Sequence, residues 1–278
     1  MFPKNGQAVA CLSITFFVYT AEFLSFFQNN KEARYLVTPG SLLTSFARVG
    51  IEANRKPVGP ETVVGADATP GPAVKGSERP VLFVFVLGES QRSRSLSIND
   101  YPRLTTPRLA ERNVISFKNV LSSGTSTAEA LPRIFSKFSR KGFDKNNGMV
   151  FENLLNVVSH AGFRVVWRDN NSGCKGLCDG FETERLNRSD DPNFCHDGNC
   201  YDEILLNGLD EIVAADVDTF LVLHLKGSHG PAYFRRYPPA FDVFRPACSN
   251  PDLSACTNEE IRNDRESAGT RLFPSCFG

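Results

Sequence analysis

Residues 81–90 read VLFVFVLGES, and this stretch decides the fold that the sequence predicts. Its first seven residues, Val81 to Leu87, are apolar without alternation, which is typical of a strand buried on both faces of a parallel sheet. Glu89 follows almost at once, and in open α/β sheets the ligand site lies beyond the carboxyl ends of the strands. Glu89 is therefore a candidate metal ligand, although a loop carboxylate that pairs with Arg92 or Arg94 fits the sequence as well.

Further strands and helices alternate along the chain after this first strand. Strands are expected at Val114–Val120, Phe163–Trp167 and Thr219–Leu225, and helices from Thr106-Pro107, from Ala128, through Phe151–Val158 before Gly162, and through Ile204–Ile212. The alternation indicates an α/β fold with a mostly parallel sheet that helices cover on both faces.

The second informative stretch is NVLSSGTSTAEALPRIFS, residues 119–136, which leads from an expected strand into an expected helix. A hydroxyl at a helix N-terminus lies beside free N–H groups and the positive end of the macrodipole, which favours an anionic phosphate. Thr127 is the candidate nucleophile. Taken alone, the stretch also fits a solvated loop that ends in a helix N-cap.

Polar residues follow two other expected strands. Arg168 to Asn171 come after one strand, and Lys226 to Gly230 come after the other. Together with the two candidates above, they bring carboxylate, hydroxyl, amide, amine and imidazole groups to one edge of the sheet. Taken singly, His229 fits a structural hydrogen-bonding role and Lys175 fits a solvated surface residue.

The composition bounds the class of protein. With 278 residues, 41% of them hydrophobic, the chain can bury a sizeable core. Lys and Arg together number 31, as do Asp and Glu, so no overall charge draws the chain to nucleic acid. We therefore expect a globular protein that does not bind nucleic acid.

Six of the eight cysteines fall into close pairs in loop-like settings. The pairs are Cys174 with Cys178, Cys195 with Cys200, and Cys248 with Cys256. Short-range disulfides in an oxidising compartment, the periplasm or the cell exterior, explain this pattern. A zinc cluster is the alternative, but the CxxC spacing expected of it is absent.

The chain divides into five expected parts. Residues 1–27 contain the uncharged run Gly6–Ala21 and form a membrane anchor, with a buried core helix as the alternative. The other parts are a juxtamembrane connector (28–53), a flexible linker rich in Pro and Gly (54–79) and a folded domain that begins near Pro80. A family resemblance divides the rest of the chain into a partial catalytic domain (80–263) and an aberrant tail (264–278).

Six ordered segments resemble the bacterial phosphoethanolamine transferases that modify lipid A, a family that includes the mobile colistin-resistance enzymes. They are GES at 88–90, NDYPRLTTPRL at 99–109, NVISFKNVLSSGTSTA at 113–128, WRDNNSGCKG at 167–176, CYDEILLNGL at 200–209 and HLKGSHGPAYFRRYP at 224–238. The likeness runs from about Ser25 to about Asn263. Sulfatases share this fold, but the CxPxR-type motif of their modified nucleophile is absent at this site.

The resemblance implies an alkaline-phosphatase/sulfatase-like α/β domain in the periplasm, anchored in the bacterial inner membrane and monomeric. It implies that Thr127 takes phosphoethanolamine from phosphatidylethanolamine as a covalent intermediate and passes it to a lipid A phosphate. It makes Glu89 and Thr127 ligands of a zinc ion (Zn2+) that neutralises charge on the reacting oxygens. Asn171, Lys175 and His229 match positions that hold the phosphoethanolamine group.

The sequence departs from the family in three ways. Ser123 and Arg133 stand where the family has a bridged pair of cysteines, only one apolar segment represents the membrane domain, and the Asp-His zinc motif is expected beyond Asn263. Thr257 and Glu260 predict a capping box, whereas 264–278 shows no helical periodicity. We expect a frameshifted or truncated copy with impaired transfer. The alternative is an inactive membrane-anchored remnant that at most binds phospholipid headgroups.

Overall fold

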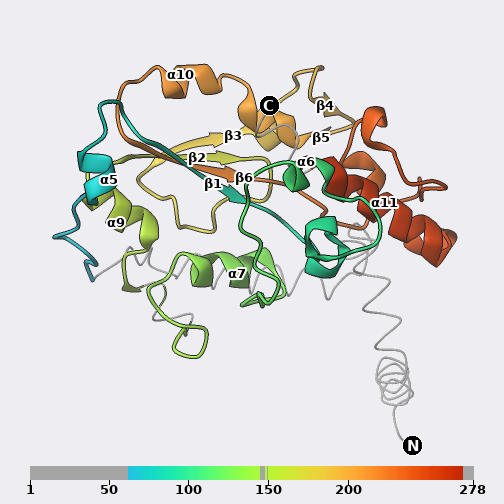
Figure 1. Ribbon diagram of the computed structural model, residues 1–278, viewed down its shortest axis with the longest axis horizontal. Coiled ribbons are helices and arrows are strands. Elements are labelled where there is room, and N and C mark those ends of the chain that lie inside the picture. Colours follow the sequence, from blue (N-terminus) through green and yellow to red (C-terminus); the bar gives the residue numbers. More distant parts are fainter. Residues whose placement is uncertain (1–61, 145–147, 149, 272–278) are drawn as a thin grey trace, which may run out of the picture. The chain divides into compact units, whose positions relative to one another are not determined.

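Four parallel strands form the sheet around which the chain folds (Figure 1). The computed structural model describes residues 62–144, 148 and 150–271. From one edge to the other, the strands are β1 (Leu82–Leu87), β6 (Thr219–His224), β2 (Arg164–Asp169) and β3 (Glu182–Arg185). Thr219 pairs with Leu82 on one side and with Arg164 on the other, so the ends of the three strands are level. The predicted α/β fold with a mostly parallel sheet is confirmed.

Short helices and turns connect these strands. The α-helices are α5 (Pro72–Lys75), α6 (Pro107–Ala110), α7 (Thr127–Ile134), α9 (Leu154–His160), α10 (Leu209–Val213) and α11 (Asn258–Arg271). The 3-10 turns are η1 (Ser93–Ser95), η2 (Ser97–Asn99), η3 (Leu186–Arg188), η4 (Asp202–Leu206), η5 (Tyr233–Arg235), η6 (Pro239–Phe241) and η7 (Leu253–Ala255). A small hairpin, β4 (Cys195–His196) and β5 (Asn199–Cys200), was not predicted.

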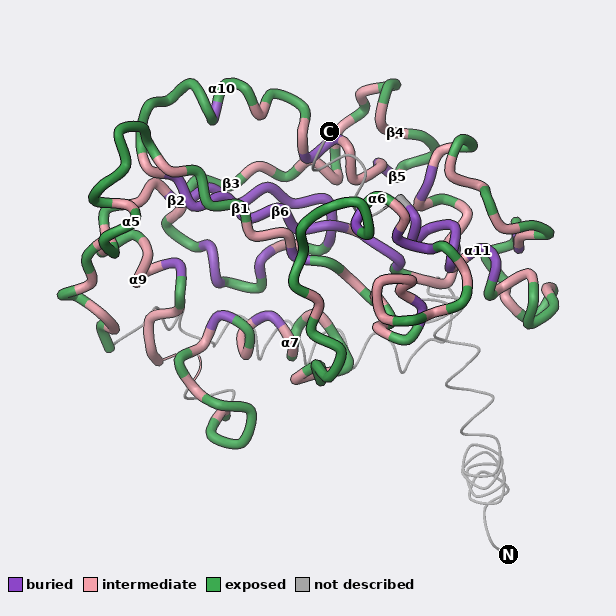
Figure 2. The backbone as a smooth tube through the Cα atoms, viewed as in Figure 1, coloured by how far each residue is buried: buried purple, intermediate pink, exposed green. Residues whose placement is uncertain are grey.

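The core lies on both faces of the sheet, and Figure 2 shows its central strands in the purple of buried residues. Successive side chains of a strand point to opposite faces. Phe220 and Val222 of β6 accordingly join a cluster with residues of α7 and α9, and Leu221 and Leu223 join another with residues of η4 and α10. Helices therefore cover both faces, as the sequence predicts.

Strand β1 is less buried than predicted. Leu82, Phe83 and Val84 are 37%, 51% and 39% exposed, and only Leu87 at its end is buried. Within the described residues β1 pairs with β6 alone and lies at the sheet edge. An edge position explains the exposure, and it could not be read from an apolar run.

The predicted strand at Val114–Val120 is wrong. The segment has no regular secondary structure, and Ile115, Phe117 and Val120 are 85%, 73% and 67% exposed. β-propensity describes side chains that fit a paired, half-buried sheet surface. No described strand pairs with this segment, so its β-branched residues have no ladder to join.

Helix α11 continues beyond the point at which helical structure was expected to stop. Its predicted capping box is confirmed, because Glu260 N donates to Thr257 Oγ1 (3.2 Å) and Thr257 N donates to Glu260 Oε2 (2.7 Å). The helix then runs to Arg271. It has no apolar stripe because its buried side is polar: Tyr237 donates to Asp264 at 2.7 Å, and Arg103 pairs with Glu266 at 2.7 Å.

The described part of the expected linker, residues 62–79, is attached to the domain. It contains α5, and Val64 N donates to Glu152 Oε2 at 3.0 Å. These residues belong to the same compact unit as the sheet. The expectation of an unstructured linker is therefore wrong for this part.

Several expectations fall outside the described residues. They concern the anchor (1–27), the connector (28–53), the first part of the linker (54–61) and the end of the tail (272–278). Within the part of the chain that the structure describes, no helix is long and apolar enough to cross a bilayer.

The expected helix through Ile204–Ile212 is divided in two. Gly208 has φ +72°, a left-handed conformation that separates η4 from α10. Glycine adopts this conformation without the steric penalty of a Cβ atom.

Candidate active site

Glu89 and Thr127 meet at the carboxyl end of β1. Thr127 is the first residue of α7, and its Oγ1 donates to Glu89 Oε2 at 2.9 Å. Ser90 Oγ donates to the other oxygen, Glu89 Oε1, also at 2.9 Å. The prediction that Glu89 and Thr127 lie together at this edge of the sheet is confirmed.

Local packing fixes the orientation of Thr127. The carbonyl of Ser126 accepts from the N–H groups of Glu129 and Ala130 at 3.0 and 2.8 Å, which starts the helix. A Cβ atom on Gly124 would lie 2.8 Å from Glu129 Cβ, so the loop needs glycine there to approach the helix. Leu131 and Phe135, buried at 3% and 1% exposed, hold α7 on the sheet.

The turn after β6 fixes the backbone of Glu89. Gly227 has φ +55°, and a Cβ atom there would lie 2.7 Å from Glu89 O. Ser228 N donates to the same oxygen at 3.2 Å. Asp202 holds this turn in place, because its carboxylate accepts from Lys226 N at 2.7 Å and from Gly227 N at 2.9 Å.

A buried carboxylate–imidazole pair lies at the ends of β2 and β6. Asp169 Oδ2 lies 2.8 Å from His224 Nδ1 and accepts from Trp167 Nε1 at 3.1 Å. Asp169 Oδ1 accepts from Asn171 N at 2.7 Å and from Gly173 N at 3.2 Å. Burial opposes ionisation of Asp169, but the hydrogen bond and charge of His224, with the other donors, lower its pKa below the ordinary value. The pair thus anchors the loop that carries Asn171 and Lys175.

The three predicted substrate-binding residues have different settings. Asn171 is 8% exposed, and its Nδ2 donates to Leu225 O at 2.9 Å, which ties the ends of β2 and β6 together. Lys175 is exposed and donates to Ser172 O at 2.6 Å, and His229 is exposed with Nδ1 2.7 Å from Gly230 O.

Within the described residues, none of these three side chains hydrogen-bonds to Thr127 or Glu89. The structure explains Asn171 as a structural link, and the substrate-binding roles of all three remain predictions.

Asp202, Asp169 and His224 were missed as site residues. A detectable signal existed for two of them, because His224 ends the buried, largely apolar strand β6 and Asp169 ends β2 two residues after its buried apolar run Val165–Trp167. A buried polar group needs a partner, so two such groups on adjacent strands indicate a pair. Asp202 carries no comparable signal, since its partners are 24 and 25 residues away.

The three predicted cysteine pairs are joined in the structure. The Cα atoms are 5.8 Å apart in Cys174–Cys178, 4.0 Å in Cys195–Cys200 and 5.8 Å in Cys248–Cys256. The Cys174–Cys178 bridge belongs to the same core cluster as Leu131 of α7 and Phe135, the residue that follows this helix. The loop that carries Lys175 and the helix that carries Thr127 therefore contribute side chains to one core cluster.

The described residues do not complete a zinc site. Glu89 and Thr127 supply two oxygen donors, whereas a catalytic zinc ion takes three protein ligands. Across residues 62–144, 148 and 150–271, no three His, Cys, Asp or Glu side chains are grouped so as to hold a metal ion. The predicted zinc does not fit the described residues by themselves.

Comparison with known proteins gives consistent matches. Residues 82–270 match the sulfatase family. The chain is 36% identical over 250 residues to phosphoethanolamine transferase EptA of Escherichia coli K12, covering 88% of this chain and 45% of EptA. It is 32% identical over 281 residues to phosphatidylethanolamine transferase Mcr-1 of Escherichia coli, covering 96% of this chain and 52% of Mcr-1. The chain thus spans about half the length of these curated relatives.

A solved structure has the same fold. The soluble domain of lipooligosaccharide phosphoethanolamine transferase A from Neisseria meningitidis superposes with a TM-score of 0.72 at 37% identity, over 76% of this chain and 64% of that domain.

Proposed function

Since this chain belongs to the sulfatase family, we propose that it transfers phosphoethanolamine from phosphatidylethanolamine to a phosphate of lipid A, with Thr127 as nucleophile. The hydrogen bond between Thr127 Oγ1 and Glu89 Oε2 carries the proposal, because it gives the hydroxyl a base within reach. The names of the similar proteins support the transferred group.

In the first half-reaction, Thr127 Oγ1 attacks the phosphorus of phosphatidylethanolamine. The Thr127 O–P bond forms, the bond from phosphorus to the glycerol oxygen breaks, and Glu89 accepts the hydroxyl proton. The departing glycerol oxygen takes its proton from solvent, so diacylglycerol leaves as the alcohol while Glu89 keeps the threonine proton for the second half-reaction. An aliphatic hydroxyl is a weak nucleophile by itself, so the carboxylate at 2.9 Å is the activating group that the described residues provide.

In the second half-reaction, a phosphate oxygen of lipid A attacks the phosphorus held on Thr127. The new O–P bond forms, the Thr127 O–P bond breaks, and the threonine oxygen recovers its proton from Glu89. Lys175 and His229 are assigned to stabilise the charge on the transferred phosphoethanolamine group. Lys175 is exposed on a loop that shares a core cluster with α7, and this exposure leaves its ammonium group accessible to a substrate phosphate.

The three disulfides support a periplasmic location, since such bonds persist in oxidising compartments. A lipid donor and a lipid acceptor both require the domain to work at a membrane surface. We therefore assign the protein to the periplasmic side of the inner membrane.

The test is lipid A mass spectrometry after expression of the full chain in a polymyxin-sensitive Gram-negative host. We expect a phosphoethanolamine adduct on lipid A that disappears in Thr127→Ala and falls sharply in Glu89→Gln. Thr125→Ala is the matched control, because Thr125 is an exposed threonine of the same loop, and this variant should keep the adduct. An adduct that persists in Thr127→Ala would exclude Thr127 as the nucleophile.

A second candidate function is the binding of phospholipid headgroups without turnover. One observation favours it: the described residues give the expected zinc ion two donors where three are needed. This candidate predicts no adduct on lipid A from any variant. It also predicts binding to phosphatidylethanolamine vesicles that Thr127→Ala leaves unchanged.

A further inference from the structure

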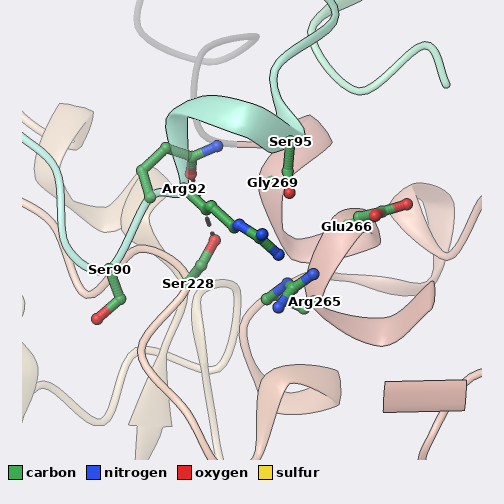
Figure 3. Close-up of a pocket in the computed structure, with 8 residues that line it drawn as sticks. Ser90, Arg92, Ser95, Ser228, Arg265, Glu266 and Gly269 are labelled. Carbon is green, nitrogen blue, oxygen red and sulfur yellow. Dashed lines mark hydrogen bonds between the residues drawn. The ribbon is translucent and has the colours of Figure 1, made fainter. Parts of the chain in front are cut away.

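The space beside the proposed active site limits how a lipid headgroup can reach Thr127. The hollow at Ser90, which Figure 3 shows between Arg92 and Arg265, has a volume of about 10 Å³. That volume holds about one water molecule and no headgroup. Thr125, in the loop that leads to Thr127, is exposed. A headgroup therefore reaches the nucleophile past this loop, which makes the surfaces on either side of the loop important.

The segment that leads into this loop exposes large apolar side chains. Ile115, Phe117, Val120 and Leu121 are 85%, 73%, 67% and 73% exposed. No described strand pairs with the segment, and its one cation, Lys118, forms an ion pair with Asp100. Single exposed apolar residues are ordinary, whereas a contiguous group of them marks an interaction surface for a membrane or a protein.

The segment that follows the nucleophile helix is basic. The charged residues between positions 130 and 143 are Arg133, Lys137, Arg140 and Lys141, although the whole chain balances 31 basic residues against 31 acidic ones. In the described part of the chain, none of the four forms an ion pair. Lys137 Nζ lies 3.7 Å from the ring centroid of Phe151, and Arg133 Cζ lies 5.0 Å from that of Phe143. The segment thus presents positive charge that no carboxylate neutralises.

Both segments belong to the same side of the sheet as helix α7. Leu131 of α7 packs in the core cluster on one face of the sheet, and Ile212 of α10 packs in the cluster on the other. Figure 1 shows α7 with the loops before and after it on the side away from α10, and Figure 2 shows much of these loops in the green of exposed residues. We call residues 114–121 and 133–141 together the α7 face.

An anionic bilayer surface matches both parts of the α7 face. Apolar side chains enter the boundary between headgroups and acyl chains, while Lys and Arg are attracted to anionic headgroups. A second copy of this chain matches less well, because two α7 faces in contact would bring like charges together.

We propose that the α7 face docks on the surface of an anionic phospholipid bilayer, with Phe117 and Leu121 at the headgroup boundary and Arg140 and Lys141 on the headgroups. Docking in this orientation holds the loop before Thr127 toward the lipid. The inference rests on the proposed function for the use of this orientation in catalysis. The docking itself rests on the exposed apolar and basic side chains.

The experiment measures how close chosen positions of the full chain lie to a bilayer. Cys11→Ser and Cys276→Ser remove the two cysteines outside the three bridges, and a dye is attached at Asn119→Cys, Ser139→Cys or Glu211→Cys, one at a time. Quenching by a nitroxide-headgroup lipid is recorded in vesicles of phosphatidylcholine mixed with phosphatidylglycerol. We expect strong quenching at the first two positions and little at the third, which belongs to α10. Equal quenching at all three positions, or none at the first two, would overturn the inference.

A charge arm tests the basic segment. Arg140→Gln combined with Lys141→Gln should reduce quenching at Ser139→Cys to its level in vesicles of phosphatidylcholine alone. Salt at about 1 M should have the same effect, because the Debye length is then only about 3 Å. The matched control combines Arg185→Gln with Arg188→Gln, two exposed arginines of β3 and η3, and should keep the quenching. Equal quenching with and without phosphatidylglycerol would overturn docking on an anionic surface.

An apolar arm tests the segment before the loop. Phe117→Ser combined with Leu121→Ser should remove most of the quenching at Asn119→Cys, and the exposure of both side chains means that the core does not depend on them. Val213→Ser, at a 57% exposed residue of α10, is the control and should leave quenching unchanged. Unchanged quenching in the double variant would overturn docking through this segment.

Failure of this inference can be distinguished from failure of the proposed function. Thr127→Ala should abolish transfer but leave quenching unchanged, because the Thr127 hydroxyl donates to Glu89 and lies outside the α7 face. The expected quenching pattern supports docking even if no adduct forms on lipid A. An adduct that forms without quenching at Asn119→Cys and Ser139→Cys would overturn docking and leave the proposed function standing.

Discussion

Replacing Asp169 by Asn should destabilise the protein although the two side chains have nearly the same shape. Asp169 accepts four hydrogen bonds while 1% exposed. An amide can keep one oxygen toward Asn171 N and Gly173 N, but its NH2 group then faces the Trp167 N–H and His224. Flipping the amide moves the conflict to the two backbone N–H groups. Each buried donor left unsatisfied costs about 1–3 kcal/mol, and breaking a buried ion pair costs about 3–5 kcal/mol.

We therefore expect Asp169→Asn to lower the free energy of unfolding by about 3 kcal/mol at pH 7. Trp167, the single tryptophan of the chain, is fully buried and allows urea unfolding to be followed by fluorescence with the disulfides intact. The control is Asp179→Asn, because Asp179 is an exposed acid directly after Cys178. This substitution should change the free energy of unfolding by less than about 0.5 kcal/mol.

A stability loss below about 1 kcal/mol in Asp169→Asn would refute the account of Asp169 as an ionised anchor. The pH dependence adds a check. The pKa of Asp169 is lowered in the folded protein, so its contribution is present above the pKa of the unfolded chain and is lost as the pH falls through the folded value. The difference between Asp169→Asn and wild type should accordingly shrink in strong acid.

Three further outcomes are expected. Gly227→Ala should destabilise the protein in urea unfolding by at least about 1 kcal/mol more than Gly198→Ala. Both glycines have positive φ, but of the two only Gly227 would place a Cβ atom against backbone, 2.7 Å from Glu89 O. Equal losses of stability in the two variants would contradict the close approach. Burial raises the pKa of Asp264 to about 6, above its value in the unfolded chain. Between pH 7 and pH 5 the folded protein therefore binds a proton that the unfolded chain does not, and wild-type stability should rise by about 1 kcal/mol over this range. Asp264→Asn should abolish that rise, and a rise that survives in this variant points to another group. Peptide mapping without reduction should find Cys174–Cys178, Cys195–Cys200 and Cys248–Cys256, whereas alkylation of these six thiols in periplasmic protein would disprove the pairing.

The sequence predicts best where the signal is local. The apolar runs that became β1 and β6 are strands, and the cysteine pairs lie four to eight residues apart and are bridged. The contact between Glu89 and Thr127 spans 38 residues, yet the rule that ligand sites lie beyond strand carboxyl ends anticipated it.

Features that depend on distant partners escaped prediction. Whether β1 is central or at an edge depends on strand order, which its own residues do not encode. Val114–Val120 has the composition of a strand but no described partner. Helix α11 buries Asp264 and Glu266 against Tyr237 and Arg103, and hydrophobic periodicity cannot detect a helix whose buried side is polar.

The edge position of β1 has a practical consequence for handling the protein. A strand edge displays a row of backbone donors and acceptors, and other chains can add to it and extend the sheet. Here Leu82, Phe83 and Val84 are exposed along that edge, and nothing in the described sequence of β1 (LFVFVL) supplies the charge or proline that usually blocks such addition. Concentrated samples should therefore self-associate through β1, and Phe83→Lys is the substitution that should keep them dispersed.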